Sequence, residues 1–248
     1  MIELEPWQWA VAGVAALLVG FSKTGIAGLG ILIVPLMVEV FPAKESVGAL
    51  LPMLIVGDVF AVVYYRRHAV WGHLVGLLPW VMGGIALGFV ALRSMNSDQL
   101  KPALGSLVLV LIGLRLVRHR FGDWFENRLP RAWWFVAGVG VVAGFATMLG
   151  NAAGAIMSVY LLAQGLKKRE FMGTGAWFYM IVNLVKVPLN VQLGLVSGGS
   201  LLFDACVVPA IVVGALVGVR VLPVVPQKVF DRVILVLAAA ASVRLIVS

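Results

Sequence analysis

Long apolar runs, separated by short polar stretches, make up most of the chain. The uninterrupted runs cover residues 45–65, 70–92, 99–117, 170–191, 200–222 and 228–247. Each has the roughly 20 residues that a helix needs to cross a bilayer. Backbone polar groups in lipid must be satisfied within their own segment, so these runs predict transmembrane helices. Two more apolar runs, residues 7–41 and 132–164, are each interrupted by a glycine-containing break.

The first interrupted run contains the stretch GFSKTGIAGLG, residues 20–30, which is poor material for a helix in lipid. The apolar parts before and after this stretch are each shorter than a transmembrane helix requires. Their length favours a re-entrant hairpin, which enters the membrane and leaves at the same face. Two short but complete crossings remain an alternative.

The second half of the chain repeats the pattern of the first. Three ordered matches pair residues 20–36 (GFSKTGIAGLGILIVPL) with 144–160 (GFATMLGNAAGAIMSVY), 44–60 with 169–185, and 77–88 with 207–218. Such matches at a nearly constant offset predict an internal duplication. We expect a first membrane repeat over residues 1–117, a basic cytoplasmic connector over residues 118–131 and a second membrane repeat over residues 132–248.

Composition and charge place these elements in a membrane. Apolar residues make up 62% of the 248 residues and charged residues only 12%, which predicts an all-α integral membrane protein. Lysine and arginine concentrate on cytoplasmic loops. With a hairpin in each interrupted run, most loop lysines and arginines fall on one face, whereas single crossings divide them almost evenly. The hairpins therefore predict two inverted repeats, with both termini in the periplasm, an architecture typical of secondary transporters.

The two breaks are candidate anion sites. A half-helix that begins inside the membrane exposes free backbone N–H groups and the positive end of its dipole. Glycine lets a ligand approach that backbone closely. The residues that we expect at the substrate site are Ser22, Lys23, Thr24, Gly25, Gly28, Gly30, Gly150, Asn151 and Gly154.

Lys23 strengthens this hypothesis, because a cation inside a membrane segment costs at least about 2.5 kcal/mol and is expected to have a partner or a function. The alternatives are that Lys23 reaches the membrane surface or pairs with Asp58. Ser22 and Thr24 would donate hydrogen bonds to the same anion, or instead to carbonyls of the preceding turn. The repeat places Thr147 at the position equivalent to Lys23, so the predicted site is asymmetric.

Polar residues in the middle of predicted spans are candidates for gating or coupling. Asp58 and its repeat equivalent Asn183 both lie mid-span, and Lys186 follows Asn183 by one helical turn. We expect either a role in gating or proton coupling, or an ion pair of Asp58 with Lys23 or Lys186.

Other kinds of chemistry lack the residues that they need. The net charge of +8 comes from short loops beside apolar segments, which indicates topology signals and lipid contact rather than nucleic-acid binding. The stretch GIAGLG has the wrong glycine order for a dinucleotide fingerprint, and the histidines lack metal-ligand spacing. We therefore predict no cofactor, no metal site and no enzymatic activity. An intramembrane enzyme acting on a lipid phosphate and a divalent metal-ion permease are the alternative classes.

The glycine-rich break followed by ILIVPL, its weaker repeat GNAAGAIMSVYLL, and the span starts AKESVGALLP and KKREFMGTGAWF resemble the TauE/SafE family of sulfite exporters over nearly the whole chain. The resemblance implies a secondary transporter that exports a small sulfur-containing oxyanion, sulfite or an organosulfonate, across the bacterial inner membrane. Together with the inverted repeats, it predicts alternating access, with the anion bound at the half-helix N-termini near the membrane midplane. The expected partners are this anion and membrane lipid, and a homo-oligomer is left open.

Overall fold

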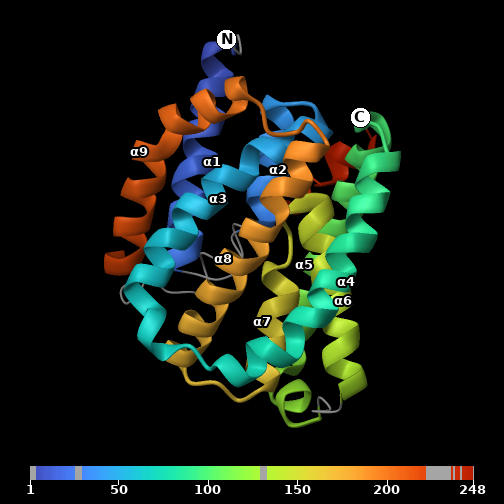
Figure 1. Cartoon of the computed structure of the whole chain (residues 1–248), viewed down its shortest axis with the longest axis vertical. Helices are drawn as coiled ribbons and strands as arrows, with labels where there is room; N and C mark the ends of the chain where they lie inside the picture. Colours follow the sequence, from blue (N-terminus) through green and yellow to red (C-terminus); the bar gives the residue numbers. More distant parts are fainter. Residues whose placement is uncertain are drawn as a thin grey trace.

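A computed structural model describes residues 4–25, 30–128, 133–221, 236, 238–240 and 242–247. These residues form α-helices and a short 3-10 helix, with no strand among them (Figure 1). The elements in chain order are α1 (Pro6–Thr24), α2 (Gly30–Val40), α3 (Ala43–Tyr65), η1 (Arg66–His68), α4 (Trp71–Ser94), α5 (Ser97–Arg128), α6 (Trp133–Gly150), α7 (Gly154–Ala163), α8 (Lys168–Gln192) and α9 (Gly198–Val221). Residues 238–240 and 242–247 are also helical.

The predicted all-α membrane fold is confirmed. Within the described part of the chain, five helices are long and apolar enough to cross a membrane. They are Ala43–His68, Trp71–Ser94, Ser97–Leu114, Trp133–Gly150 and Gly198–Arg220. The predicted span over residues 170–191 forms α8, and the run over residues 228–247 lies partly outside the described residues. The chain is therefore a multi-pass membrane protein.

The predicted connector over residues 118–131 begins as a continuation of a membrane helix. Helix α5 does not end at residue 117 but runs on to Arg128, and residues 129–132 lie outside the described part of the chain. The division of the chain into two repeats and a connector stays a prediction.

Both interrupted runs fold back on themselves. Near the start of α1, the side chain of Gln8 donates to the carbonyl of Val40, at the end of α2, over 3.4 Å. In the second run, Trp133 at the start of α6 contacts Trp80, and Tyr160 in α7 donates to the carbonyl of His73. Trp80 and His73 both lie in the first half of α4. The two ends of each run therefore lie near each other, as a hairpin requires.

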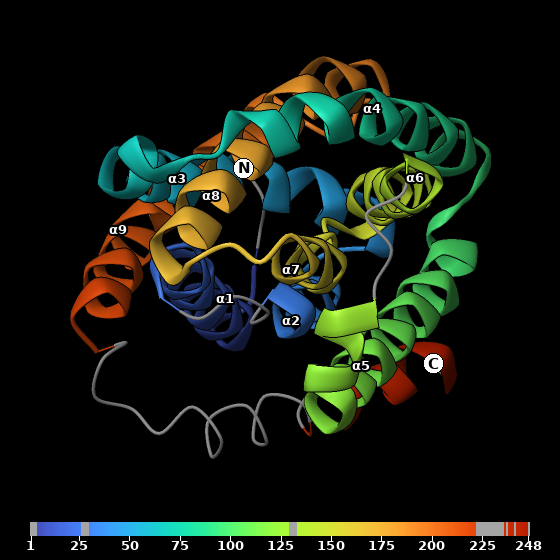
Figure 2. The same cartoon turned by 90° about the horizontal axis from the view of Figure 1, so that it is seen from below.

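Close backbone contacts join α1 to α9 and α4 to α6, and Figures 1 and 2 show each pair side by side. A Cβ atom on Gly20 would overlap the carbonyl of Ile211. At the equivalent position of the second repeat, a Cβ atom on Gly144 would overlap the carbonyl of Val81. Glycine is needed here because each partner backbone occupies the space of a side chain, as at small-residue interfaces of membrane helices.

Helices α3 and α8 contact each other through two glycines, Gly48 and Gly173, that the predicted repeats match. Gly48 of α3 lies against Leu195, just after the end of α8, whereas Gly173 of α8 lies against Tyr65, at the end of α3. The two helices are therefore antiparallel. Matched contacts and an antiparallel central pair are what two inverted repeats would produce, and the inversion across a bilayer stays a prediction that they support.

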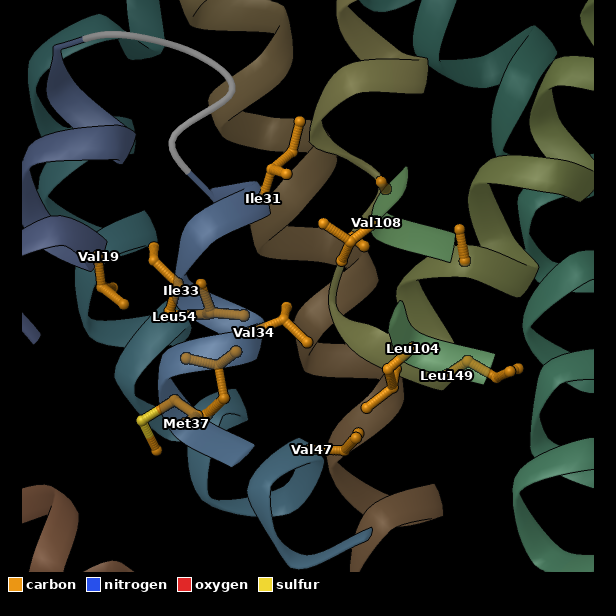
Figure 3. Close-up of a cluster of buried hydrophobic side chains, with 14 of the residues drawn as sticks. Val19, Ile31, Ile33, Val34, Met37, Val47, Leu54, Leu104, Val108 and Leu149 are labelled. Atoms are coloured by element: carbon orange, nitrogen blue, oxygen red, sulfur yellow. The ribbon is translucent and has the colours of Figure 1, made fainter. Parts of the chain in front are cut away.

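Helix α2 lies in the apolar centre of the molecule, beside the contact of α3 and α8. Its residues Ile33, Val34 and Met37 are at most 3% exposed, and Figure 3 shows them among side chains of neighbouring helices. Val47 and Leu54 of α3 belong to the same buried cluster. A dry apolar layer therefore occupies the space between the first break and the end of the molecule where α3 begins.

Candidate functional site

The two breaks lie on one cavity of about 80 Å³. By the same measure a water molecule needs about 10–15 Å³, so the cavity has room for roughly five. Some of the predicted site residues line this cavity: Ser22, Lys23, Gly30, Asp58, Asn151, Gly154 and Asn183. Thr147, Tyr179 and apolar side chains of α2, α3, α7 and α8 complete the lining. The cavity can therefore hold a small, partly hydrated polar ligand.

Lys23 stands at the edge of this cavity, near the end of α1. Its ammonium nitrogen lies 2.7 Å from a carboxylate oxygen of Asp58 and 4.4 Å from the ring centroid of Tyr179. The side chain of Asp58 is fully buried, while that of Lys23 is 10% exposed. The ion pair between Lys23 and Asp58 was one of the predicted alternatives, and it leaves Lys23 accessible from the cavity.

A second buried lysine lies behind the cavity wall. The ammonium nitrogen of Lys186 donates to the carbonyl and hydroxyl oxygens of Thr147, at 3.0 and 3.1 Å, and to the side-chain oxygens of Asn183, at 3.1 Å, and Asn151. The carbonyl and the two amide oxygens can only accept. Protonated Lys186 has three N–H donors, one for each of these acceptors.

Asp58 and Asn183 connect the two lysines. The amide nitrogen of Asn183 donates to the second carboxylate oxygen of Asp58 over 2.6 Å, and its amide oxygen accepts from Lys186. A continuous polar chain thus runs from Lys23 through Asp58 and Asn183 to Lys186. The chain contains two lysine amino groups and a single carboxylate, so it carries an excess positive charge when both lysines are protonated.

Asn151 shapes the second break. Its backbone has a φ of 54°, in the left-handed region that asparagine tolerates better than most residues. The amide nitrogen of its side chain donates to the carbonyl of Val47, in α3, over 3.1 Å, while the amide oxygen accepts from Lys186. The second break is therefore held on one side by α8 and on the other by the start of α3.

Both half-helix N-termini face the cavity. Gly30 and Ile31 in the first turn of α2 line it, as do Ala152 and Gly154 at the start of α7. The first N–H groups of a helix have no partner within the helix, and they favour a negative ligand. The prediction that both breaks face one site agrees with this arrangement.

Some predicted site residues lie elsewhere. Thr24 is turned away from the cavity, because its hydroxyl donates to the carbonyl of Ala215 in α9 over 2.8 Å. Gly25 lies against Gly218 of α9, and Gly150 against Leu104 of α5. None of these three is part of the cavity lining. Gly28 lies outside the described residues.

Ser22 and Lys186 also have contacts that bear on their predicted roles. Ser22 lines the cavity, but its hydroxyl donates to the carbonyl of Val19 over 2.9 Å, which is the alternative that the sequence left open. Lys186 is fully buried behind the lining rather than in it. Its contacts with Thr147 and Asn151 make it a residue that positions the second break.

Tyr179 and Thr147 are lining residues absent from the predicted set. Tyr179 precedes Asn183 by four residues and Lys186 by seven, so the three share one face of α8. A search for further residues on the face of α8 that carries Asn183 and Lys186 would have identified Tyr179. Thr147 is the repeat equivalent of Lys23, and the matching of repeats alone points to it.

The cavity extends toward one end of the molecule. Its lining includes Ala61 near the end of α3, Leu161 near the end of α7 and Phe171 near the start of α8. Exposed basic residues cluster at this end: Arg66, Arg67, Lys167 and Arg169. Toward the opposite end, the apolar layer of α2 and α3 closes the cavity.

Acidic, histidine and cysteine side chains are sparse at the site. Among the described residues, no three of them come together in a group that could hold a metal ion. Asp58 is the acidic residue in the lining, and both of its carboxylate oxygens contact Lys23 or Asn183.

Comparison with known proteins gives one match that covers most of the chain. The family model described as Sulfite exporter TauE/SafE matches residues 12–245. No curated protein and no solved structure matches the chain significantly.

Proposed function

Because the chain belongs to the TauE/SafE family of sulfite exporters, we propose that it exports sulfite or a small organosulfonate from the cytoplasm by alternating access. Family membership implies a transporter of an anion, which agrees with a role other than catalysis. The proposal adds that the anion binds in the central cavity, beside Lys23 and the first turns of α2 and α7. It also assigns the protein to the bacterial inner membrane, with periplasmic termini.

The observation that carries the proposal is the presence of two lysines and a single carboxylate beside two half-helix N-termini. Lys23 and Lys186 share a single carboxylate, that of Asp58. An uncompensated cation in a membrane interior is costly, and an anion in the cavity would lower that cost. The first N–H groups of α2 and α7, which have no partner within their own helix, favour the same sign of ligand.

The cavity extends toward the end of the molecule that we assign to the cytoplasm. Its end carries Arg66, Arg67 and Arg169, and loops rich in arginine and lysine face the cytoplasm. The structure would then be an inward-facing state that loads its anion from the cytoplasm. An inside-negative potential drives anion exit by about 2.3 kcal/mol per charge per 100 mV, so export needs no coupling ion.

Alternating access requires the apolar layer on the far side of the cavity to open. This layer contains Val34 and Met37 of α2 and Val47 of α3, all nearly inaccessible. In the other predicted repeat, the equivalent helices α7 and α8 line the part of the cavity that extends toward the basic end. An exchange of the two repeat conformations would move the opening to the opposite face, which is how inverted-repeat transporters operate.

Efflux from proteoliposomes tests the proposal. The purified protein is reconstituted, the vesicles are loaded with sulfite, thiosulfate, sulfate, sulfoacetate or acetate, and release is measured under a potential that is negative inside. We expect saturable release of sulfite or sulfoacetate, faster than from protein-free vesicles. Transport of Ni²⁺ or Co²⁺ without transport of any of these anions would favour the permease alternative and contradict the proposal.

A further inference from the structure

We propose that Tyr179 binds the transported oxyanion directly, its hydroxyl donating a hydrogen bond to the anion at the N-terminus of α7 while its ring holds Lys23. This inference rests on the proposed function and names a binding residue within the same site. Tyr179 comes from α8, yet it reaches both breaks, and this position sets it apart from the predicted site residues.

The ring of Tyr179 positions the lysine. The ammonium nitrogen of Lys23 lies 4.4 Å from the ring centroid, within the range of a cation–π interaction. The same nitrogen is 2.7 Å from Asp58. Lys23 is thus held between a carboxylate and an aromatic face, and its remaining N–H donors are available to the cavity.

The hydroxyl of Tyr179 lies at the second break. Its oxygen is 3.9 Å from the position that a Cβ atom on Gly154 would occupy, at the first residue of α7. Among the described residues this hydroxyl has no hydrogen-bond partner, in contrast to those of Tyr65 and Tyr160, which donate to the carbonyls of Thr24 and His73. An O–H donor beside unpaired helix N–H groups is suited to an oxygen of an anion.

Ser22, Asn151 and Asn183 already donate to protein acceptors, and the hydroxyl of Thr147 accepts from Lys186. The hydroxyl of Ser22 donates to Val19, and the amide nitrogens of Asn151 and Asn183 donate to Val47 and Asp58. An anion would have to break one of these bonds to recruit Ser22. Tyr179 donates without such a cost, so it is the stronger candidate for direct contact.

Tyr179 also makes the site asymmetric. Its repeat equivalent is Leu54, which lines the same cavity but cannot donate. Lys23 likewise has Thr147 as its equivalent. The cation and the tyrosine therefore come from opposite repeats and converge on one side of the cavity, which favours an anion whose oxygens contact both.

Replacing Tyr179 with phenylalanine tests the hydroxyl alone. Tyr179→Phe keeps the ring beneath Lys23 and removes the donor. A hydrogen bond to a charged group contributes about 1.5–3 kcal/mol, so we expect the Kd for sulfite, measured by calorimetry in detergent, to rise about tenfold to a hundredfold. Tyr179→Leu, which copies the equivalent residue of the first repeat, removes both ring and hydroxyl and should weaken binding further.

The matched control is Tyr160→Phe. Tyr160 is a buried tyrosine whose hydroxyl bonds His73 outside the cavity, so its loss should leave the Kd for sulfite unchanged. A purely structural role of Tyr179 would lower the melting temperature of the free protein in Tyr179→Phe and leave the Kd near that of the wild type. An unchanged Kd in a folded Tyr179→Phe, beside a wild type that binds sulfite, overturns this inference and leaves the proposed function standing.

A second measurement needs no substitution at position 179. The chain has four tyrosines, so protein labelled with ¹³C at the ring carbon that bears the hydroxyl gives few NMR signals. Single phenylalanine variants of Tyr64, Tyr65 and Tyr160 assign the fourth signal to Tyr179. On titration with sulfite we expect the signal of Tyr179 to shift most. Binding of sulfite without any shift of that signal contradicts direct contact.

Discussion

Replacing Lys23 with alanine is expected to abolish sulfite efflux from proteoliposomes. The change removes an ammonium group that lines the cavity next to the first break. A charge-assisted hydrogen bond contributes about 1.5–3 kcal/mol, and the loss of the lysine charge from a low-dielectric site adds to this. We expect binding of sulfite to weaken about a hundredfold or more, measured by calorimetry alongside the efflux rate.

Two related variants separate direct contact from a general effect of charge. Lys23→Met combined with Asp58→Asn removes a whole ion pair, so it leaves no buried carboxylate unpaired and keeps the positive charge of Lys186. If Lys23 contacts the anion, this double variant folds but does not transport. Asp58→Asn alone removes the carboxylate that competes with the anion for Lys23, and should bind sulfite more tightly. Normal efflux by the double variant would exclude Lys23 from the binding site.

Lys186→Met is expected to destabilise the protein strongly and to stop transport. Lys186 is fully buried and donates to oxygens of Thr147, Asn151 and Asn183. Each buried polar group left without a partner costs about 1–3 kcal/mol, so we expect a total loss of about 3 kcal/mol or more. The measurement is the melting temperature in detergent, read from tryptophan fluorescence.

Lys44→Met provides the matched control for Lys186. Lys44 is a partly buried lysine that, like Lys186, has a carbonyl partner, that of Met95 over 2.8 Å, but it lies at the start of α3 and is not part of the cavity lining. We expect a small decrease in melting temperature and normal efflux. Equal decreases in melting temperature for the two variants would mean that the contacts of Lys186 do not stabilise the second break more than the single contact of Lys44 stabilises its own surroundings.

The helices were predictable because a segment that crosses lipid must be long, apolar and able to satisfy its own backbone hydrogen bonds. A run such as residues 45–65 has to satisfy its backbone internally, and α3 covers nearly the same residues, Ala43–Tyr65. The breaks were predictable for the same reason, since glycines and Lys23 are unsuited to a continuous helix in lipid. The matching of repeats also paired Asp58 with Asn183, and these two side chains are hydrogen-bonded.

The directions of individual side chains were less predictable. Ser22, Lys23 and Thr24 are consecutive, but successive residues of a helix point about 100° apart, so one triplet cannot all face the same ligand. Which of them faces the cavity depends on α9, whose Ala215 carbonyl accepts from Thr24. The spacing of Tyr179 from Asn183 and Lys186 places it on the polar face of α8, but its contact with both breaks depends on how α8 packs against them, which is a tertiary feature.

The end of the connector and most of the chain after α9 lie outside the described residues. The orientation of the repeats in a bilayer rests on the fold-back of the two interrupted runs and on the basic residues at one end. Gln8 and Val40 are in contact in the structure, so labels placed on their flanking residues should react from the same side of the membrane.

The claim that the two breaks form one anion site is tested most directly by a structure with selenite, the heavier analogue of sulfite. Selenite is located by its anomalous scattering. We predict one selenium peak in the central cavity, in contact with the Lys23 ammonium group and the first N–H groups of α7. A peak bound elsewhere, with this cavity free of selenite at saturating concentration, would contradict the claim that the two breaks form the anion site.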